Sequence, residues 1–117
     1  MSTEIVKKEE FTVVKFNSGR LDTTNASELK SEFLFLHNNS ENNIVLDLSR
    51  CKYCDSSGLR AILVGNRLCE DSIGTFIVCG LQPDVEHLIR ISMLHTVLLI
   101  VKDVEQAEDL IYRKKQM

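Results

Sequence analysis

The chain has 117 residues, of which 44% are apolar and 26% charged, and its net charge is −3. This length and composition are typical of one globular domain with a hydrophobic core, and the basic residues form no stripe of the kind that binds nucleic acid. The sequence shows no apolar run near the roughly 20 residues of a membrane span and no signal peptide at its start, so we expect a cytoplasmic protein.

The chain begins with two segments that predict a β-hairpin. Residues Glu4–Lys8 and Phe11–Phe16 alternate or run apolar, and charged residues separate them. This pattern is typical of two adjacent antiparallel strands. The polar segment Gly19–Thr24 then predicts a loop.

The next segment predicts a helix over residues 25–37. Asn25 and Glu28 have the spacing of a capping box, in which two side chains satisfy the free N–H groups of a helix start. A polar turn rich in asparagine ends the segment. Four apolar residues recur at helical spacing and should face the core: Ala26, Leu29, Phe33 and Leu36.

The centre of the chain predicts a buried strand, a turn and a second helix. Ile44–Leu48 is apolar apart from Asp47, which either is buried or faces outward. The turn Asp55–Gly58 then opens a helix that runs to about Asp71. The first turns of this helix are apolar nearly all round, so both of its sides must be covered.

The last third predicts two more strands and two more helices. Thr75–Cys79 and Val97–Val101 have the composition of strands, and Pro83 suits the first position of the intervening helix. Asp103 and Gln106 have capping-box spacing before the final helix. The expected buried stripe of the third helix comprises Val85, Leu88, Ile89 and Met93, and that of the fourth comprises Val104, Ala107, Leu110 and Ile111.

The order of elements predicts an α/β fold. Strands that alternate with helices form a mostly parallel sheet, here with about five strands, about four helices and an antiparallel hairpin at one side. Functional loops of such sheets collect beyond the carboxyl ends of the strands. We therefore expect Arg20–Thr24 and Asp55–Gly58 to lie at the same end of the domain.

The turn Asp55-Ser56-Ser57-Gly58 carries the most suggestive chemistry in the sequence. Aspartate, serine and glycine are preferred at helix N-caps, so one interpretation is a capping turn and nothing more. The other is a site where a serine carries a phosphate, because the first N–H groups of a helix and its dipole favour an anion.

Three segments together resemble the STAS domain family, in particular the stand-alone bacterial anti-sigma-factor antagonists. The resemblance covers nearly the whole chain, so residues 1–117 are expected to form a single STAS domain. The segments are Gly19-Arg20-Leu21-Asp22, the strand Ile44–Leu48 followed by Asp55-Ser56-Ser57-Gly58-Leu59, and Phe76–Cys79 followed by Pro83 and Val85.

The resemblance implies a binding protein without cofactor or metal that regulates transcription by partner switching. In this family the second serine of the motif, here Ser57, is phosphorylated by a partner that is both a serine kinase and an anti-sigma factor. The unphosphorylated form binds that partner and frees the sigma factor, and a serine phosphatase resets the switch. The residues that would surround the phosphosite and contact the partner are Asp22, Thr23, Thr24, Asp55, Ser56, Gly58, Leu59 and Arg60.

Elementary electrostatics agrees with such a switch. A phosphate adds a charge of about −1.5 to −2 and three acceptor oxygens. At a helix N-terminus this charge does not require a change of fold. Beside Asp55 and Asp22 it would make the surface more negative, and a partner shaped for a neutral hydroxyl would then bind less well.

Other interpretations stay open at this point. Cys51-Lys52-Tyr53-Cys54 is a C-x-x-C pattern of the kind found in redox pairs, in a linker where family members usually carry aliphatic residues. Zinc binding would also need Cys69 and Cys79. A hydrolase would need a base beside Ser57, and His95 is the one candidate, although it is expected at the opposite end. An alternative function is a STAS scaffold or accessory transporter subunit without a phospho-switch.

Overall fold

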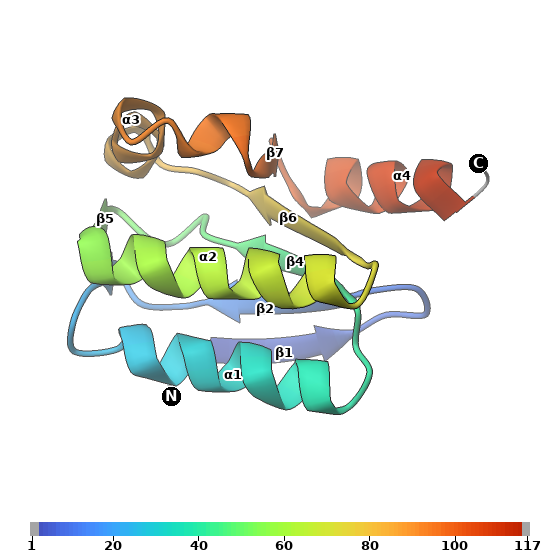
Figure 1. Cartoon of the computed structure of the whole chain (residues 1–117). Coiled ribbons are helices and arrows are strands. Elements are labelled where there is room, and N and C mark those ends of the chain that lie inside the picture. Colours follow the sequence, from blue (N-terminus) through green and yellow to red (C-terminus); the bar gives the residue numbers. More distant parts are fainter. Residues whose placement is uncertain (1–2, 116–117) are drawn as a thin grey trace.

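The structure is a computed structural model that describes residues 3–115. Its centre is a five-stranded sheet with the strand order β1-β2-β4-β6-β7 (Figure 1). β1 is antiparallel to β2, and the other neighbouring strands are parallel. The strands are β1 (Thr3–Lys7), β2 (Thr12–Phe16), β4 (Asn43–Asp47), β6 (Thr75–Cys79) and β7 (Leu99–Val101).

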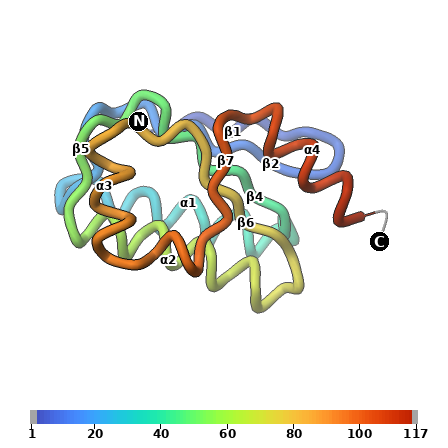
Figure 2. The backbone as a smooth tube through the Cα atoms, turned by 90° about the horizontal axis from the view of Figure 1, so that it is seen from above, coloured from blue at the N-terminus to red at the C-terminus, as the bar shows by residue number. Residues whose placement is uncertain are grey.

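Four α-helices within residues 3–115 cover both faces of this sheet, as Figure 2 shows from above. α1 and α2 pack side by side on one face, α3 lies at their end, and α4 covers the other face. The predicted α/β fold is confirmed. The helices are α1 (Ala26–Asn38), α2 (Ser56–Asp71), α3 (Pro83–Ile91) and α4 (Val104–Lys115).

The apolar strands divide their side chains between two cores. Val14, Leu46 and Val78 belong to the larger core under α1, α2 and α3. Val13, Val45 and Ile77 point to the opposite face and meet α4. Because successive residues of a strand face opposite sides, a strand buried on both faces is apolar throughout. The central strands are therefore fixed in the middle of the molecule.

The first helix has the predicted buried stripe but not the predicted cap. Its four buried residues are those expected from the spacing. Asn25 occupies the N-cap position, yet its side chain accepts no hydrogen bond from the helix. The Asn25 Oδ1 atom instead accepts from the backbone N–H of Asp22 at 3.0 Å, and its Nδ2 donates to Arg20. The capping-box prediction for Asn25 was thus wrong.

The segment between α3 and α4 also differs from the prediction. α3 ends at Ile91, and Met93 follows in the left-handed conformation with φ of 62°, exposed rather than part of the buried stripe. A 3₁₀ turn, η1 (Leu94–Thr96), follows Met93, and β7 begins at Leu99 and not at Val97, so this strand is two residues shorter than predicted.

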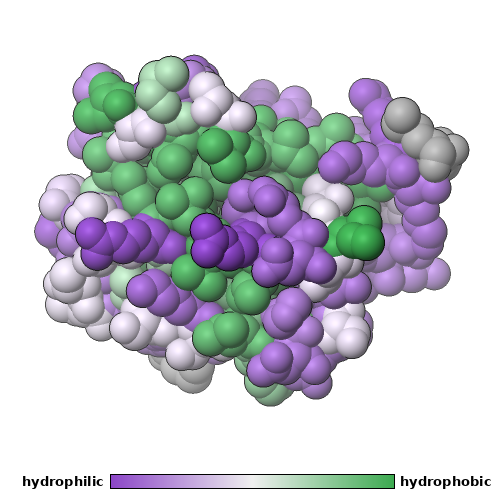
Figure 3. All heavy atoms as spheres, viewed as in Figure 1, coloured by the Kyte–Doolittle hydropathy of each residue, from purple (hydrophilic) through white to green (hydrophobic). Residues whose placement is uncertain are grey.

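This departure leaves apolar side chains at the surface. Figure 3 shows apolar atoms gathered between α2 and the segment from α3 to β7. The exposed members of this segment are Ile91, Met93, Val97 and Leu99.

Candidate functional site

A second, very small sheet brings the two predicted site segments together. β3 (Arg20–Leu21) and β5 (Tyr53–Cys54) pair in parallel at the end of the molecule where the parallel strands of the large sheet terminate. The Gly19 carbonyl accepts from the N–H groups of Lys52 and Tyr53, and the Leu21 carbonyl accepts from that of Asp55 at 3.2 Å. Asp22 and Asp55, each directly after its strand, therefore lie at the same end, as the sequence predicted.

Gly58 allows α2 to begin against this small sheet. A Cβ atom at position 58 would lie 2.6 Å from the Cys54 Sγ atom, 2.7 Å from the Leu21 carbonyl oxygen and 2.8 Å from the Leu21 Cγ atom. Such distances are shorter than real Cβ contacts, so any larger residue would displace its neighbours. The glycine of the second motif thus packs on the leucine of the first.

Asp55 is the N-cap of α2. Its backbone is extended, and its Oδ1 atom accepts a hydrogen bond from the Gly58 N–H at 3.0 Å. The Asp55 carbonyl accepts from the Leu59 N–H and closes the first turn. The capping interpretation of this turn is therefore correct as far as Asp55 is concerned, and it leaves both serines free of that role.

Ser56 and Ser57 occupy the first two positions of α2. Ser56 is exposed and Ser57 is half-buried. Within residues 3–115 the structure shows no hydrogen-bond partner for the Ser57 hydroxyl. The hydroxyl lies beside the positive end of the helix dipole and remains accessible from outside.

Asp22 organises the loop after β3. Its Oδ1 atom accepts from the Thr24 hydroxyl at 2.6 Å and the Thr24 N–H at 3.0 Å, and its Oδ2 atom accepts from the Arg20 guanidinium at 3.3 Å. The Thr24 hydrogen bonds and, to a smaller extent, the Arg20 guanidinium hold the pKa of Asp22 below its ordinary value. Thr23 is exposed at the tip of this loop.

The remaining predicted neighbours of Ser57 divide into buried and exposed residues. Gly58 and Leu59 are buried and support the turn from inside. Arg60 is exposed and, four residues after Ser56, lies on the same side of the helix. The structure therefore leaves Ser56, part of Ser57 and Arg60 as the surface of the α2 start.

The sequence analysis missed a stacked pair beside these residues. The Arg20 guanidinium lies over the ring of Tyr53, 4.1 Å from its centroid, and Tyr53 is 42% exposed. The two residues face each other because they are partners in the β3–β5 register. One signal was available in the sequence: a large aromatic residue in an otherwise polar linker.

The cysteines do not have the environment of a redox pair. All four are buried, and Cys51 and Cys54 donate to backbone carbonyls. Burial raises the pKa of Cys54, Cys69 and Cys79 to about 12 and also raises that of Cys51. Reactive cysteines need the opposite shift, toward the thiolate. Among residues 3–115 no cluster of side chains suits a metal ion.

His95 is not part of this site. It lies in η1, which packs against α3, and its Nδ1 atom is buried without a hydrogen-bond partner among residues 3–115. An activated serine nucleophile has a base hydrogen-bonded to its hydroxyl. Within residues 3–115 the Ser57 hydroxyl has no hydrogen bond to a histidine.

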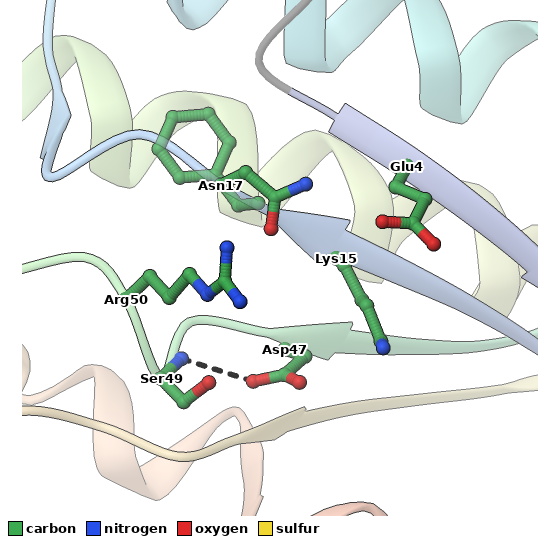
Figure 4. Close-up of a pocket in the computed structure, with 7 residues that line it drawn as sticks. Glu4, Lys15, Asn17, Asp47, Ser49 and Arg50 are labelled. Carbon is green, nitrogen blue, oxygen red and sulfur yellow. Dashed lines mark hydrogen bonds between the residues drawn. The ribbon is translucent and has the colours of Figure 1, made fainter.

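A small polar hollow lies near the carboxyl ends of β2 and β4 (Figure 4). Its volume is about 150 Å³, and the Asp47 carboxylate at its rim accepts a hydrogen bond from the Ser49 N–H at 2.9 Å. Its charged side chains are balanced: Glu4 and Asp47 against Lys15 and Arg50. The hollow therefore has no excess charge that would select an anion or a cation.

Comparison with known proteins identifies a matching family and a similar sequence. The sequence pattern of the STAS domain matches residues 2–107. A protein of Bordetella bronchiseptica named "Putative anti-sigma factor antagonist BtrV" is 29% identical over 89 residues, which are 76% of this chain and 77% of that protein. No helix among residues 3–115 is long and apolar enough to cross a membrane.

Solved structures show the same fold. An anti-sigma-factor antagonist (STAS) domain protein from Planctomyces limnophilus has a TM-score of 0.86 at 18% identity, covering 94% of this chain and 97% of its own. The Bacillus cell fate determinant SpoIIAA in its phosphorylated form has a TM-score of 0.72 at 18% identity, covering 92% and 98%.

Proposed function

The chain belongs to the STAS domain family, and we propose that it is an anti-sigma-factor antagonist whose binding is switched off by a phosphate on Ser57. The relative in Bordetella bronchiseptica and the solved neighbour from Planctomyces limnophilus carry this name, and another neighbour, SpoIIAA, was solved in a phosphorylated form. The position of Ser57 is the main support for the proposal. Ser57 is half-buried in the first turn of α2, and within residues 3–115 its hydroxyl has no hydrogen-bond partner.

The surroundings of Ser57 suit a phosphate without refolding. The Asp55 cap engages the N–H of Gly58, and the N–H groups of Ser56 and Ser57 are left for another acceptor. The helix dipole favours a negative charge at this end by about 0.3–1 kcal/mol. Phosphorylation would therefore change the charge of the surface and keep its shape.

In the proposed cycle, the unphosphorylated chain binds an anti-sigma factor that is also a serine kinase, and the sigma factor is released. The kinase transfers a phosphate to the Ser57 hydroxyl, and the added charge weakens the complex. A serine phosphatase then restores the binding form. The chain acts in the cytoplasm as a binding protein and contributes the acceptor hydroxyl, while both catalytic sites belong to its partners.

A phosphorylation assay tests the site. The full chain is incubated with ATP and the anti-sigma kinase encoded in the same genome, and its mass is measured. We expect a gain of about 80 Da, the mass of one phosphoryl group, confined to Ser57. Ser57→Ala should lose the gain, whereas the matched variant Ser56→Ala should keep it. No gain with any such kinase would favour a scaffold without a phospho-switch.

A binding assay tests the switch. Ser57→Asp should no longer bind the kinase while it keeps the melting transition of the parent, because the substitution places a charge at a tolerant helix start. Ser57→Ala should bind and stay bound in the presence of ATP. Equal binding by Ser57→Asp and the parent would overturn the electrostatic switch.

A further inference from the structure

At the end of the molecule around β3, β5 and the α2 start, the basic side chains are exposed and the two acidic residues are half-buried. Arg20, Lys52 and Arg60 are exposed. Within residues 3–115 neither Lys52 nor Arg60 has an ion pair. The two acids of this region are engaged: Asp22 accepts from Thr24 and Arg20, and Asp55 accepts from Gly58.

The stacked Arg20–Tyr53 pair gives this region a preorganised centre. The Tyr53 ring supports the guanidinium from one side, and Asp22 fixes its Nε atom. The Arg20 side chain is 64% exposed, so a partner can reach its guanidinium. Arginine and tyrosine held in this way are the residues that most often dominate the affinity of protein interfaces.

Acidic residues on α3 border the basic residues, so the charge changes sign across this end of the molecule. α3 packs beside β5, and its first turn carries the exposed Asp84 and the half-buried Glu86, which pairs with Arg90. The whole chain has a net charge of −3, so the basic region is local. A partner with a complementary charge pattern would bind in one orientation.

We propose that Arg20, Lys52, Tyr53 and Arg60 form a docking surface, here called the basic docking surface, for an acidic region of the partner protein. This inference rests on the proposed function and adds the chemistry of the partner's surface. It also changes the explanation of the switch. A phosphate on Ser57 would offset the positive charge of the docking surface and repel the partner's carboxylates, rather than adding to a surface that is already negative.

The first test needs no substitution. The association rate of the unphosphorylated full chain with the anti-sigma kinase is measured by stopped flow at increasing NaCl concentration. If opposite charges attract the two proteins, the association rate should fall about tenfold or more from low salt to about 0.5 M salt, because salt screens exposed charges. A rate that does not fall with salt would overturn the proposal.

The second test reverses one charge. Arg60→Glu should slow association about tenfold at low salt and flatten the salt dependence. The matched control is Lys114→Glu, which makes the same charge change at an exposed position near Glu10 and Thr75, at the opposite end of the sheet. This control should slow association less than about twofold, since the site lies beyond the screening length.

A third variant tests the centre of the surface. Arg20→Gln removes the charge and keeps a polar side chain, and it should raise the dissociation rate about tenfold or more if Arg20 meets a carboxylate. Each variant is first compared with the parent by thermal melting. Equal effects of Arg60→Glu and Lys114→Glu would show that only net charge matters and would overturn the docking surface.

The outcomes separate this inference from the proposed function. In one outcome the parent binds the kinase and gains a phosphate, while salt, Arg60→Glu and Arg20→Gln leave binding unchanged. This result would contradict the proposed acidic surface of the partner and would leave the phospho-switch intact. A parent chain that neither binds the kinase nor gains a phosphate would overturn both.

Discussion

At the scale of single residues, Gly58 is where the two halves of the candidate site touch. Gly58→Ala would force a Cβ against the Leu21 carbonyl and the Cys54 sulfur. We expect the free energy of unfolding to fall by about 1–3 kcal/mol, as is usual for overpacking. Urea unfolding measures this change. Gly19→Ala is the matched control, because nothing lies within 4 Å of a Cβ there, and it should change stability by less than about 0.5 kcal/mol.

Glu41 predicts a pH dependence of stability. Its carboxylate pairs with the Lys7 Nζ atom at 2.5 Å and accepts from the buried Thr12 hydroxyl at 3.0 Å. The Lys7 hydrogen bond is the main cause that holds the pKa of Glu41 below its ordinary value of 4.5. A lowered folded pKa contributes stability above the unfolded pKa, and this contribution is lost as the pH falls through the folded pKa.

The measurement is the free energy of urea unfolding at pH values on either side of 4.5. The parent should lose more stability on acidification than Glu41→Gln, which cannot titrate at this position. Identical pH profiles would show that the Lys7–Glu41 contact does not stabilise the folded chain.

The residues of the candidate site could be predicted in part. Asp22, Asp55 and Ser57 lie in the segments that follow the predicted strands ending at Phe16 and Leu48, and the topology places such segments at one end of the sheet. The partner of Asn25 could not be predicted, because its spacing fits a cap and a loop contact equally well, and the loop geometry decides. The Arg20–Tyr53 stack depends on a register between two-residue strands, and strands this short have no periodicity to read.

At the scale of elements, the Asp55 cap determines how α2 begins. Asp55→Ala removes the acceptor of the Gly58 N–H, and we expect a loss of about 1 kcal/mol in the free energy of unfolding. Thermal and urea unfolding measure this loss. Asp55→Asn keeps an oxygen at the same position and should stay close to the parent. Equal losses for the two variants would mean that the charge of Asp55, and not its role as a cap, stabilises α2.

Elements with a buried apolar stripe were predicted well, and elements without one were not. Ala107 and Ile111 fix α4, and Val85 and Ile89 fix α3, as the spacing indicated. β3 and β5 are held mainly by backbone hydrogen bonds, for which the sequence has no pattern. Met93 continues the helical spacing of α3 but lies beyond its end, because the backbone turns left-handed there.

At the scale of the whole molecule, the thiols report on unfolding. All four cysteines are buried, and burial raises the pKa of three of them to about 12. We therefore expect slow reaction with a thiol reagent at neutral pH under native conditions, and rapid reaction of all four in urea. Rapid native labelling of Cys51 or Cys54 would instead indicate an open and reactive pair.

The β3–β5 ladder has a consequence for spectroscopy. The amide protons of Lys52, Tyr53 and Asp55 are held by carbonyls of Gly19 and Leu21, so each connects parts of the chain that are distant in sequence. Their NMR resonances should respond to an event at either segment. Three backbone signals in a ¹⁵N-labelled sample would thus report occupancy of this end of the domain without any added probe.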